Sequence, residues 1–168
     1  MKKLGKEFFH RDALEVAPEL VGKYLVSNIN GEEIRIQITE TEAYCGEHDT
    51  ACHAHKGRTP RTEVLYGESG IIYVYLCYGM HWLMNVITGE VGTPQGVLIR
   101  AGKGFSGPAK LTKALGITGK QNKKPIYRNN EVWIEDDGKP HKFHTDVRVG
   151  INYATEEYIK KQWRFILD

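Results

Sequence analysis

The chain has 168 residues, 40% hydrophobic and 26% charged, with a net charge of +2, which is typical of one ordinary globular domain. Its longest apolar runs are too short to span a bilayer, and no apolar segment follows the basic start, so we predict neither a membrane anchor nor a signal peptide. Three cysteines without a framework spacing favour a reducing, intracellular location: cytoplasm or nucleoid in a bacterium, nucleus in a eukaryote.

The first predicted elements are a short helix and a hairpin. Asp12 is a suitable N-cap for a helix over residues 13–17. An apolar strand at 24–26 then leads to Asn30-Gly31, a dipeptide that strongly favours a hairpin turn. The sequence therefore predicts that the next strand returns antiparallel to the first.

The returning strand turns from apolar to acidic. The isoleucines of 34–38 alternate with polar residues, as in a half-buried strand. Continuing this alternation places Glu40, Glu42 and Tyr44 on the isoleucine face. A buried carboxylate is costly and is typical of functional sites. The alternative is that the strand emerges into solvent after Thr39, and the pattern alone does not decide between the two.

A long loop and an apolar hairpin follow. Residues 46–70 are rich in Gly, His, Thr, Pro and charge, and long loops in compact domains are usually functional. Strands at 71–76 and 82–87 then form a hairpin with Tyr78 and Met80 near its tip. An apolar wedge on a turn can enter a stack of nucleic-acid bases. Tyrosines at a turn can equally cover the edge of a core.

The remaining elements indicate the fold class. We predict a strand at 97–100, a helix at 108–115 between Pro108 and Gly116, a strand at 131–135 and a strand at 147–151. Strands and helices do not alternate regularly. The chain is therefore predicted to be a mixed α/β protein that is rich in mainly antiparallel strands.

One cluster could suggest a metal site: His48, Cys52, His53 and His55. Its spacing is poor, because no second Cys-x-x-Cys pair is present and adjacent Cys52 and His53 do not easily chelate one ion. We therefore expect no metal. The sequence also has no phosphate-loop, dinucleotide-binding or nucleophile-elbow motif, which argues against the common nucleotide-dependent and hydrolase classes.

Basic residues are distributed unevenly. Residues 1–100 carry a net charge of −3 and residues 101–168 carry +5. Two short basic loops, 58–61 and 106–110, suit phosphate contacts, and the second ends at a helix N-terminus. These features are compatible with a polyanionic partner, but each loop can also be an ordinary solvated one.

Taken together, these segments resemble the alkyladenine (3-methyladenine) DNA glycosylases of the mammalian type, from about residue 4 to about residue 166. The matching segments are 39–44, 51–53, 59–61, 73–80, 84–85, 97–101, 106–111 and 148–150. The most specific are 39–44 and 73–80. One departure is that only residues 102–105 precede the Ser-Gly-Pro segment, where the family commonly carries a longer insertion.

The resemblance implies an enzyme that flips damaged purines out of duplex DNA and hydrolyses the bond between base and sugar. The implied substrates are 3-methyladenine, 7-methylguanine, hypoxanthine and etheno-adenine. Glu42 would act as general base on the attacking water, and Arg100 and the backbone carbonyl of Val149 would help to hold that water.

The resemblance also implies roles for other side chains. Tyr44, His53 and Tyr75 would stack on and hydrogen-bond the flipped base, and Asn85 would disfavour guanine. Tyr78 would fill the gap in the duplex, with Met80 beside it. Contacts to the DNA backbone are expected from Arg58, Thr59, Arg61 and Lys110.

The implied protein is a single domain over residues 1–168, of the α+β class. We expect a curved, mainly antiparallel sheet, a protruding β-hairpin and flanking helices. No lysine or N-terminal amine stands at a matching nucleophile position, so we expect a monofunctional enzyme without lyase activity, cofactor or metal. The expected partner is duplex DNA, bound by a monomer away from any membrane. A non-catalytic binder of distorted or alkylated DNA is the main alternative, because it would keep Tyr78 but would not need Glu42.

Overall fold

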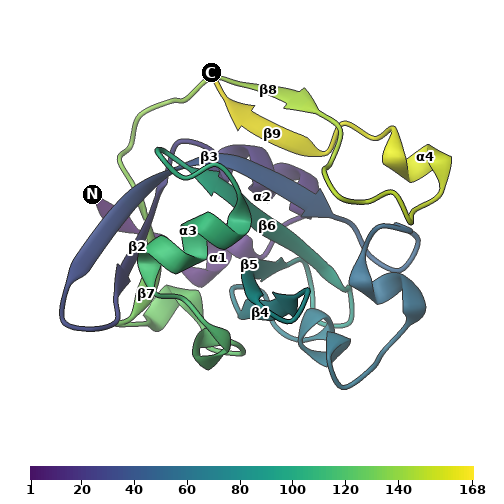
Figure 1. Ribbon diagram of the computed structural model, residues 1–168, viewed down its shortest axis with the longest axis horizontal. Helices are drawn as coiled ribbons and strands as arrows, with labels where there is room; N and C mark the ends of the chain where they lie inside the picture. The colour runs from purple at the N-terminus through teal and green to yellow at the C-terminus, as the bar shows by residue number, and fades with distance from the viewer.

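Nine strands form one sheet in which every pairing is antiparallel, as the computed structural model of residues 1–168 shows (Figure 1). The path of neighbouring strands is β1-β7-β2-β3-β6-β5-β4, and β9 joins β3 to β8. The strands are β1 (Lys2–Lys3), β2 (Tyr24–Asn28), β3 (Glu33–Tyr44), β4 (Ile72–Cys77), β5 (His81–Thr88), β6 (Gln95–Gly102), β7 (Val132–Asp136), β8 (Phe143–Asp146) and β9 (Arg164–Leu167).

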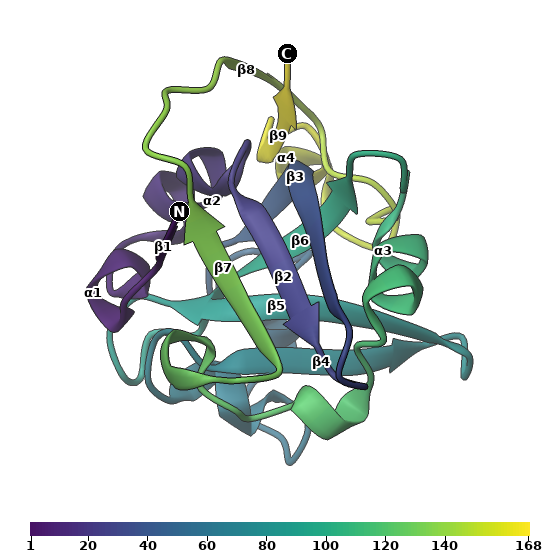
Figure 2. The same ribbon diagram turned by 90° about the vertical axis from the view of Figure 1, so that its left-hand side faces the viewer.

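Short helices flank this sheet (Figure 2). The α-helices are α1 (Lys6–Phe9), α2 (Ala13–Leu20), α3 (Pro108–Leu115) and α4 (Glu156–Ile159); the 3-10 helices are η1 (His53–Lys56), η2 (Thr62–Tyr66), η3 (Gly119–Gln121) and η4 (Ile126–Arg128). No helix is both long enough and apolar enough to cross a membrane. The predicted α+β fold with a mainly antiparallel sheet is confirmed.

Strand β3 is the centre of the sheet. Its first half pairs with β2 and its second half with β9, while β6 follows its other edge. The register with β6 shifts between Ile38 and Thr41, an irregularity that bends a strand. Beyond it, Thr41 donates a 2.7 Å hydrogen bond to the Ala17 carbonyl of α2, and Ala43 joins the apolar core. The core thus holds the second half of β3 in place.

Local signals fix the two longer helices. The Asp12 carboxylate accepts the Leu14 N–H at 2.8 Å and caps α2. Helix α3 has Pro108 in its first turn and ends at Gly116, whose φ of 73° is left-handed. The apolar faces of both helices enter one core cluster together with β3 and β6.

The β4–β5 hairpin protrudes from the body of the molecule, as expected (Figure 2). Its tip carries Tyr78, which is 92% exposed, and Met80, which is 69% exposed. Tyr78 has a φ of 53°, a left-handed conformation that is uncommon for a bulky residue. The tip therefore presents a large ring to solvent on a strained turn.

The predicted strand at 147–151 is wrong. This segment has no strand pairing, because the Val149 N–H donates to a side chain of β3 and Gly150 takes a left-handed φ of 74°. The nearby strands are instead β8 and β9, which pair with each other. The long loop at 46–70 contains η1 and η2 and otherwise lacks regular structure.

Candidate active site

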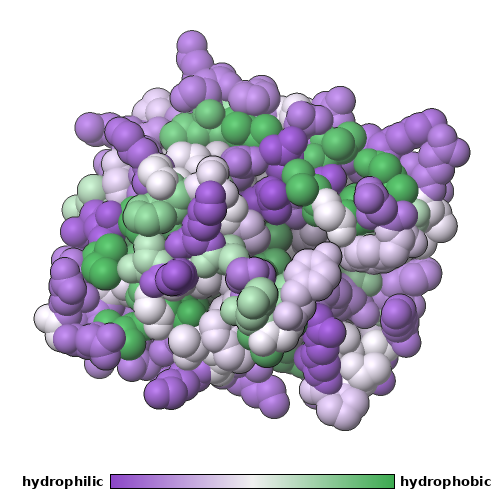
Figure 3. Space-filling model, viewed as in Figure 1, coloured by the Kyte–Doolittle hydropathy of each residue, from purple (hydrophilic) through white to green (hydrophobic).

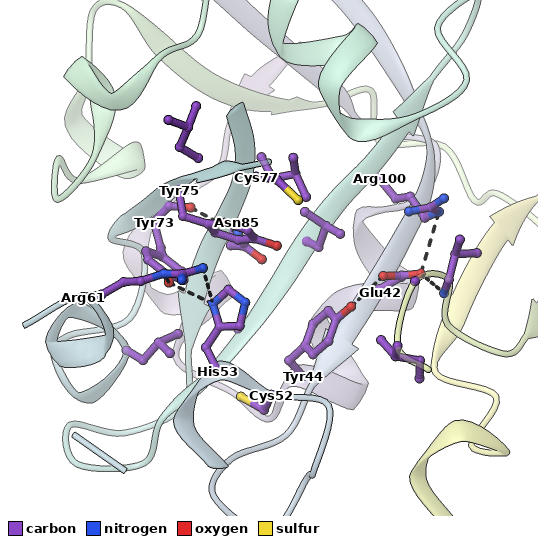
Figure 4. A pocket seen from close by; sticks show the side chains of 18 of the residues that line it. Glu42, Tyr44, Cys52, His53, Arg61, Tyr73, Tyr75, Cys77, Asn85 and Arg100 are labelled. Atoms are coloured by element: carbon purple, nitrogen blue, oxygen red, sulfur yellow. Dashed lines mark hydrogen bonds and ion pairs between the residues drawn. The ribbon is translucent and has the colours of Figure 1, made fainter. Parts of the chain in front are cut away.

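A cavity of about 480 Å³ lies beside the second half of β3, between strands β4 to β6 and the segment 149–153 (Figure 4). Of the thirteen predicted site residues, nine line it: Glu42, Tyr44, His53, Arg61, Tyr75, Tyr78, Asn85, Arg100 and Val149. The face shown in Figure 3 is hollowed near its centre, with apolar patches around the hollow. The sequence therefore identified most of one real cavity.

Glu42 is fully buried in the cavity wall. Its Oε1 accepts the Tyr44 hydroxyl at 2.8 Å, and its Oε2 accepts the Val149 N–H at 2.8 Å. The Arg100 Nε lies 3.7 Å from Oε2 (Figure 4). The alternative that β3 emerges into solvent after Thr39 is wrong, because β3 stays paired with β6 as far as Tyr44 and the Glu42 side chain is fully buried.

Opposing effects set the protonation of Glu42. Burial raises the pKa of its carboxyl, and the Val149 N–H, the Arg100 charge and the Tyr44 hydroxyl lower it in part. The burial of the Tyr44 hydroxyl, together with the Glu42 charge, raises the pKa of Tyr44 well above its usual range. Tyr44 therefore remains a donor, and Glu42 is a carboxylate that takes up a proton more readily than an ordinary glutamate.

An aromatic group faces Tyr44 across the cavity (Figure 4). The ring centroids of His53 and Tyr75 are 4.6 Å apart, and those of Tyr73 and Tyr75 are 5.3 Å apart. The Arg61 guanidinium lies 5.1 Å from the centroid of the Tyr75 ring. Rings on both sides of a cavity can hold a flat aromatic ligand by stacking.

The hydrogen bonds around His53 define its tautomer. Arg61 Nε donates to the Tyr73 hydroxyl at 3.3 Å, and Arg61 Nη2 lies 3.5 Å from His53 Nδ1. Arginine can only donate, so Nδ1 is the acceptor in its contact with Arg61 and carries no proton. The Tyr73 hydroxyl, 2.9 Å from Nδ1, is therefore the donor in that hydrogen bond. Burial and the Arg61 and Lys56 charges lower the pKa of His53 to about 4. The ring is therefore neutral at pH 7 and carries its proton on Nε2.

Asn85 projects from β5 and is 6% exposed. Its Nδ2 donates to the Tyr73 carbonyl at 3.2 Å, so the amide is held in one orientation by the neighbouring strand. Tyr78 lines the mouth of the cavity as well as the hairpin tip, whereas Met80 lies on the tip alone. The wedge and the pocket are thus contiguous.

The predicted DNA-backbone contacts do not form one group. Arg58 forms a two-point ion pair with Glu63 at 2.6 and 2.7 Å, and Thr59 hydrogen-bonds Thr62. Both hold η2 in place, while Arg61 points at the cavity wall. Lys110 is exposed in the first turn of α3, away from this loop in the sequence.

The residues of the metal-site alternative have separate partners. Cys52 is buried, His53 contacts Tyr73, and His55 Nδ1 lies 2.8 Å from the Glu47 carbonyl. No group of three or more His, Cys, Asp or Glu side chains is arranged to hold a metal ion. The side chains that are close in the sequence are therefore not arranged around one common point.

Several contacts were not predicted. Tyr73 belongs to the cavity, and its two-residue spacing from Tyr75 on β4 is the signal that could have indicated this. Tyr153 lines the mouth of the cavity and donates to the Ala51 carbonyl at 2.7 Å. The Val149 N–H on Glu42 joins residues 107 positions apart, and no local pattern announces it.

A fully buried carboxylate in a cavity walled by aromatic rings, beside an exposed aromatic wedge, suits an enzyme that acts on a flat base taken out of a stack. The sequence model of the methylpurine-DNA glycosylase family matches residues 7–105 and 103–168 of the chain. The chain therefore belongs to this family and is a DNA glycosylase. The two matched segments meet where the sequence shows a shortened connection after Arg100.

Relatives from three organisms match almost the whole chain. The proteins from Clostridium botulinum, Borrelia garinii and Natranaerobius thermophilus are 43%, 41% and 40% identical, and each match covers 98% of this chain and 95% of the relative. Each bears the name "Putative 3-methyladenine DNA glycosylase".

Proposed function

We propose that this protein releases damaged purines from duplex DNA by hydrolysis of the N-glycosidic bond, with the chemistry of the mammalian-type enzymes that it resembles. The proposed substrates are 3-methyladenine, 7-methylguanine, hypoxanthine and etheno-adenine. The observation that carries the proposal is the carboxylate of Glu42, fully buried at the wall of a cavity whose other walls are aromatic.

In this proposal the flipped base enters between Tyr44 and the pair of His53 and Tyr75. Tyr78 occupies the space that the base leaves in the duplex, since its ring is exposed at the mouth of the same cavity. The neutral His53 offers its Nε2–H to an acceptor atom on the base. Stacking and this donor recognise the base without requiring a charged side chain.

Glu42 is the proposed general base. A carboxylate has about four lone-pair sites, and Tyr44 and Val149 occupy only two hydrogen-bonding positions on it. A water molecule can therefore bind Glu42 and lose a proton to it while it attacks C1′. The purine takes the electron pair of the C1′–N bond: a methylated, positively charged purine leaves as a neutral base, and hypoxanthine or etheno-adenine leaves after it takes up a proton from water. Positive charge develops on the sugar as the base departs, and the same carboxylate stabilises that charge.

We also propose that the chemistry ends with release of the base. No lysine is placed as a nucleophile among the residues that line the cavity, so we propose a monofunctional enzyme that leaves an intact abasic strand. One site on a continuous duplex needs no second copy, so we propose that a monomer acts. Phosphate contacts should make DNA binding weaken as salt rises.

The test is single-turnover base release from a duplex with one hypoxanthine and from methylated DNA. Wild type should release bases, and Glu42→Gln should be about 10³-fold slower. The matched control is Glu40→Gln, which removes a carboxylate of the same strand that pairs with Arg164 at 2.7 Å and lies outside the cavity. We expect this control to stay within about twofold of wild type.

Other outcomes would overturn parts of the proposal. Lesion binding without release by wild type would identify a non-catalytic binder. Release that survives Glu42→Gln would refute the role of Glu42. Strand cleavage without added alkali would refute the monofunctional chemistry.

A further inference from the structure

Next to the cavity, Arg148 and Asp49 form an ion pair in which both side chains are fully buried. The pair is bidentate, with N–O distances of 2.7 and 2.9 Å. A buried ion pair is a poor source of stability compared with apolar packing, because both charges lose their hydration. We therefore ask which neighbouring segments the ion pair holds in position.

Each partner ties together separate parts of the chain. The Asp49 carboxylate also accepts the N–H groups of Cys45 and Ala51, at 3.0 and 3.1 Å. Arg148 also donates to the carbonyls of Ala43 and Tyr158, at 3.0 and 3.2 Å. The pair therefore joins the end of β3, the loop after it, and the segment at 147–151.

These contacts lie around the two groups that donate hydrogen bonds to Glu42, the Val149 N–H and the Tyr44 hydroxyl. Arg148 directly precedes Val149, whose N–H is bonded to Glu42, and Arg148 donates to the carbonyl of Ala43, which directly follows Glu42. One side chain thus anchors the chain on both sides of that hydrogen bond. The Arg148 guanidinium also lies 4.9 Å from the centroid of the Tyr44 ring, whose hydroxyl is the second donor to Glu42.

We propose that Arg148, held by Asp49, is a positioning residue that keeps the Val149 N–H and the Tyr44 hydroxyl on the Glu42 carboxylate. This inference rests on the proposed function for its effect on rate. Arg148 does not line the cavity, so it acts through these neighbours and not on the substrate. Asp49 offsets part of the Arg148 charge, and the rest lowers the pKa of Glu42, so a variant that keeps the charge, Arg148→Lys, separates geometry from charge.

Few other charges face Glu42. The charged groups are Arg100 on β6 and Arg148 on the segment after β8, and the neutral titratable groups are Tyr44 on β3 and Tyr153 on that same segment. Arg164 of the adjoining strand β9 is engaged by Glu40 and Asp146. Loss of the Val149 N–H removes a donor to the ionised form of Glu42, so its pKa should rise and less of the base form should be present at a given pH.

The experiment compares the double variant Asp49→Asn/Arg148→Met with a control, Arg35→Met/Glu135→Gln. The control removes a 2.8 Å ion pair between β3 and β7, far along the sheet from the cavity. The readouts are the Glu42 carboxyl titration by 13C NMR, assigned by its absence in Glu42→Gln, and single-turnover release of 7-methylguanine at pH 6. Thermal unfolding is measured for both variants.

The double variant should titrate Glu42 at higher pH than wild type and release base about 10-fold more slowly or worse, as expected for a misplaced catalytic group. The control should lose stability without either change. Arg148→Lys should be intermediate, because lysine keeps the charge but not the two-point geometry.

An unchanged titration together with a rate within twofold of wild type would overturn the proposal. If the double variant does not fold, Arg148→Lys decides in the same way. If wild type releases no base at all, the proposed function fails, but the NMR titration still tests the positioning.

Discussion

The two halves of β3 bury different kinds of side chain. Near its start, Ile36 and Ile38 are buried in the apolar core, where each contributes about 1.5–3 kcal/mol by leaving water. Near its end, the same strand buries Glu42, whose charge is disfavoured by burial. Stability and reactivity therefore come from different residues of one rigid element, and mutations should separate them.

Glu42→Gln should give the largest separation. We expect single-turnover release to fall about 10³-fold. The free energy of unfolding at pH 7 should rise by about 1 kcal/mol, because residues that serve activity at a functional site often lower stability. The sign follows from the raised pKa of Glu42: the fold prefers the protonated form, so ionisation at neutral pH is destabilising. The gain should shrink as the pH falls through that pKa, where wild type regains stability. Thermal unfolding at pH 7 and pH 5 measures this, and a variant less stable than wild type at pH 7 would contradict it.

Ile38→Ala should show the converse behaviour. Truncation of this fully buried side chain should cost about 2–5 kcal/mol of stability. At a temperature where the variant is fully folded, single-turnover release should stay within about twofold of wild type, since the side chain does not line the cavity. Denaturant unfolding and base release on the same sample check this. A large rate loss in the folded variant would show that the two halves of the strand are not separable.

Tyr78→Gly tests the exposed side of the site. Glycine adopts the left-handed φ of 53° without strain, so stability should be unchanged or rise by up to about 1 kcal/mol. Loss of the ring should lower kcat/KM on lesion duplexes about 10-fold, because nothing then fills the unstacked step. Val91→Ala, at an exposed apolar residue of another turn, is the control. Equal effects of the two changes on kcat/KM would argue against the wedge.

Asn85→Ala should change the choice of base and leave the overall activity nearly unchanged. Removal of the amide from the pocket should increase release of 7-methylguanine relative to hypoxanthine by about 10-fold, the range expected for a small change in pocket shape. The lost hydrogen bond to Tyr73 should cost about 1 kcal/mol of stability. Competition between the two substrates in one reaction measures the ratio, and an unchanged ratio would refute a role in selecting the base.

What the sequence predicted depends on how local each signal is. The bounds of α3 were predicted correctly because Pro108 and Gly116 mark its two ends within the helix itself. The β4–β5 hairpin and the turn at Asn30-Gly31 were likewise visible in short patterns. Such elements need no knowledge of distant residues.

The rest of the site depends on long-range contacts. The segment at 147–151 reads as a strand, but the Val149 N–H bonds a carboxylate 107 positions earlier. The Arg148–Asp49 pair spans 99 positions. The sequence predicted that Arg61 contacts the DNA backbone together with Arg58. In the structure, Arg61 instead contacts Tyr73 and Tyr75 of β4 at the cavity wall. The alternation along β3 predicted Glu42 on the isoleucine face, and this is wrong. The irregularity between Ile38 and Thr41 reverses the alternation, so that Ala43 shares the core with Ile38 while Glu42 lines the cavity on the opposite face.

The most direct test of the account is the pH dependence of single-turnover release of 7-methylguanine between pH 5 and 8. This base is already activated by methylation, so its release does not depend on protonation of the substrate. The pKa of His53, lowered to about 4, keeps that residue largely neutral over this range. We predict one acid limb, with its midpoint above the ordinary glutamate value because burial raises the pKa of Glu42, and we predict that Glu42→Gln abolishes the limb. A flat profile, or a limb that persists in Glu42→Gln, would contradict the central role of this carboxylate.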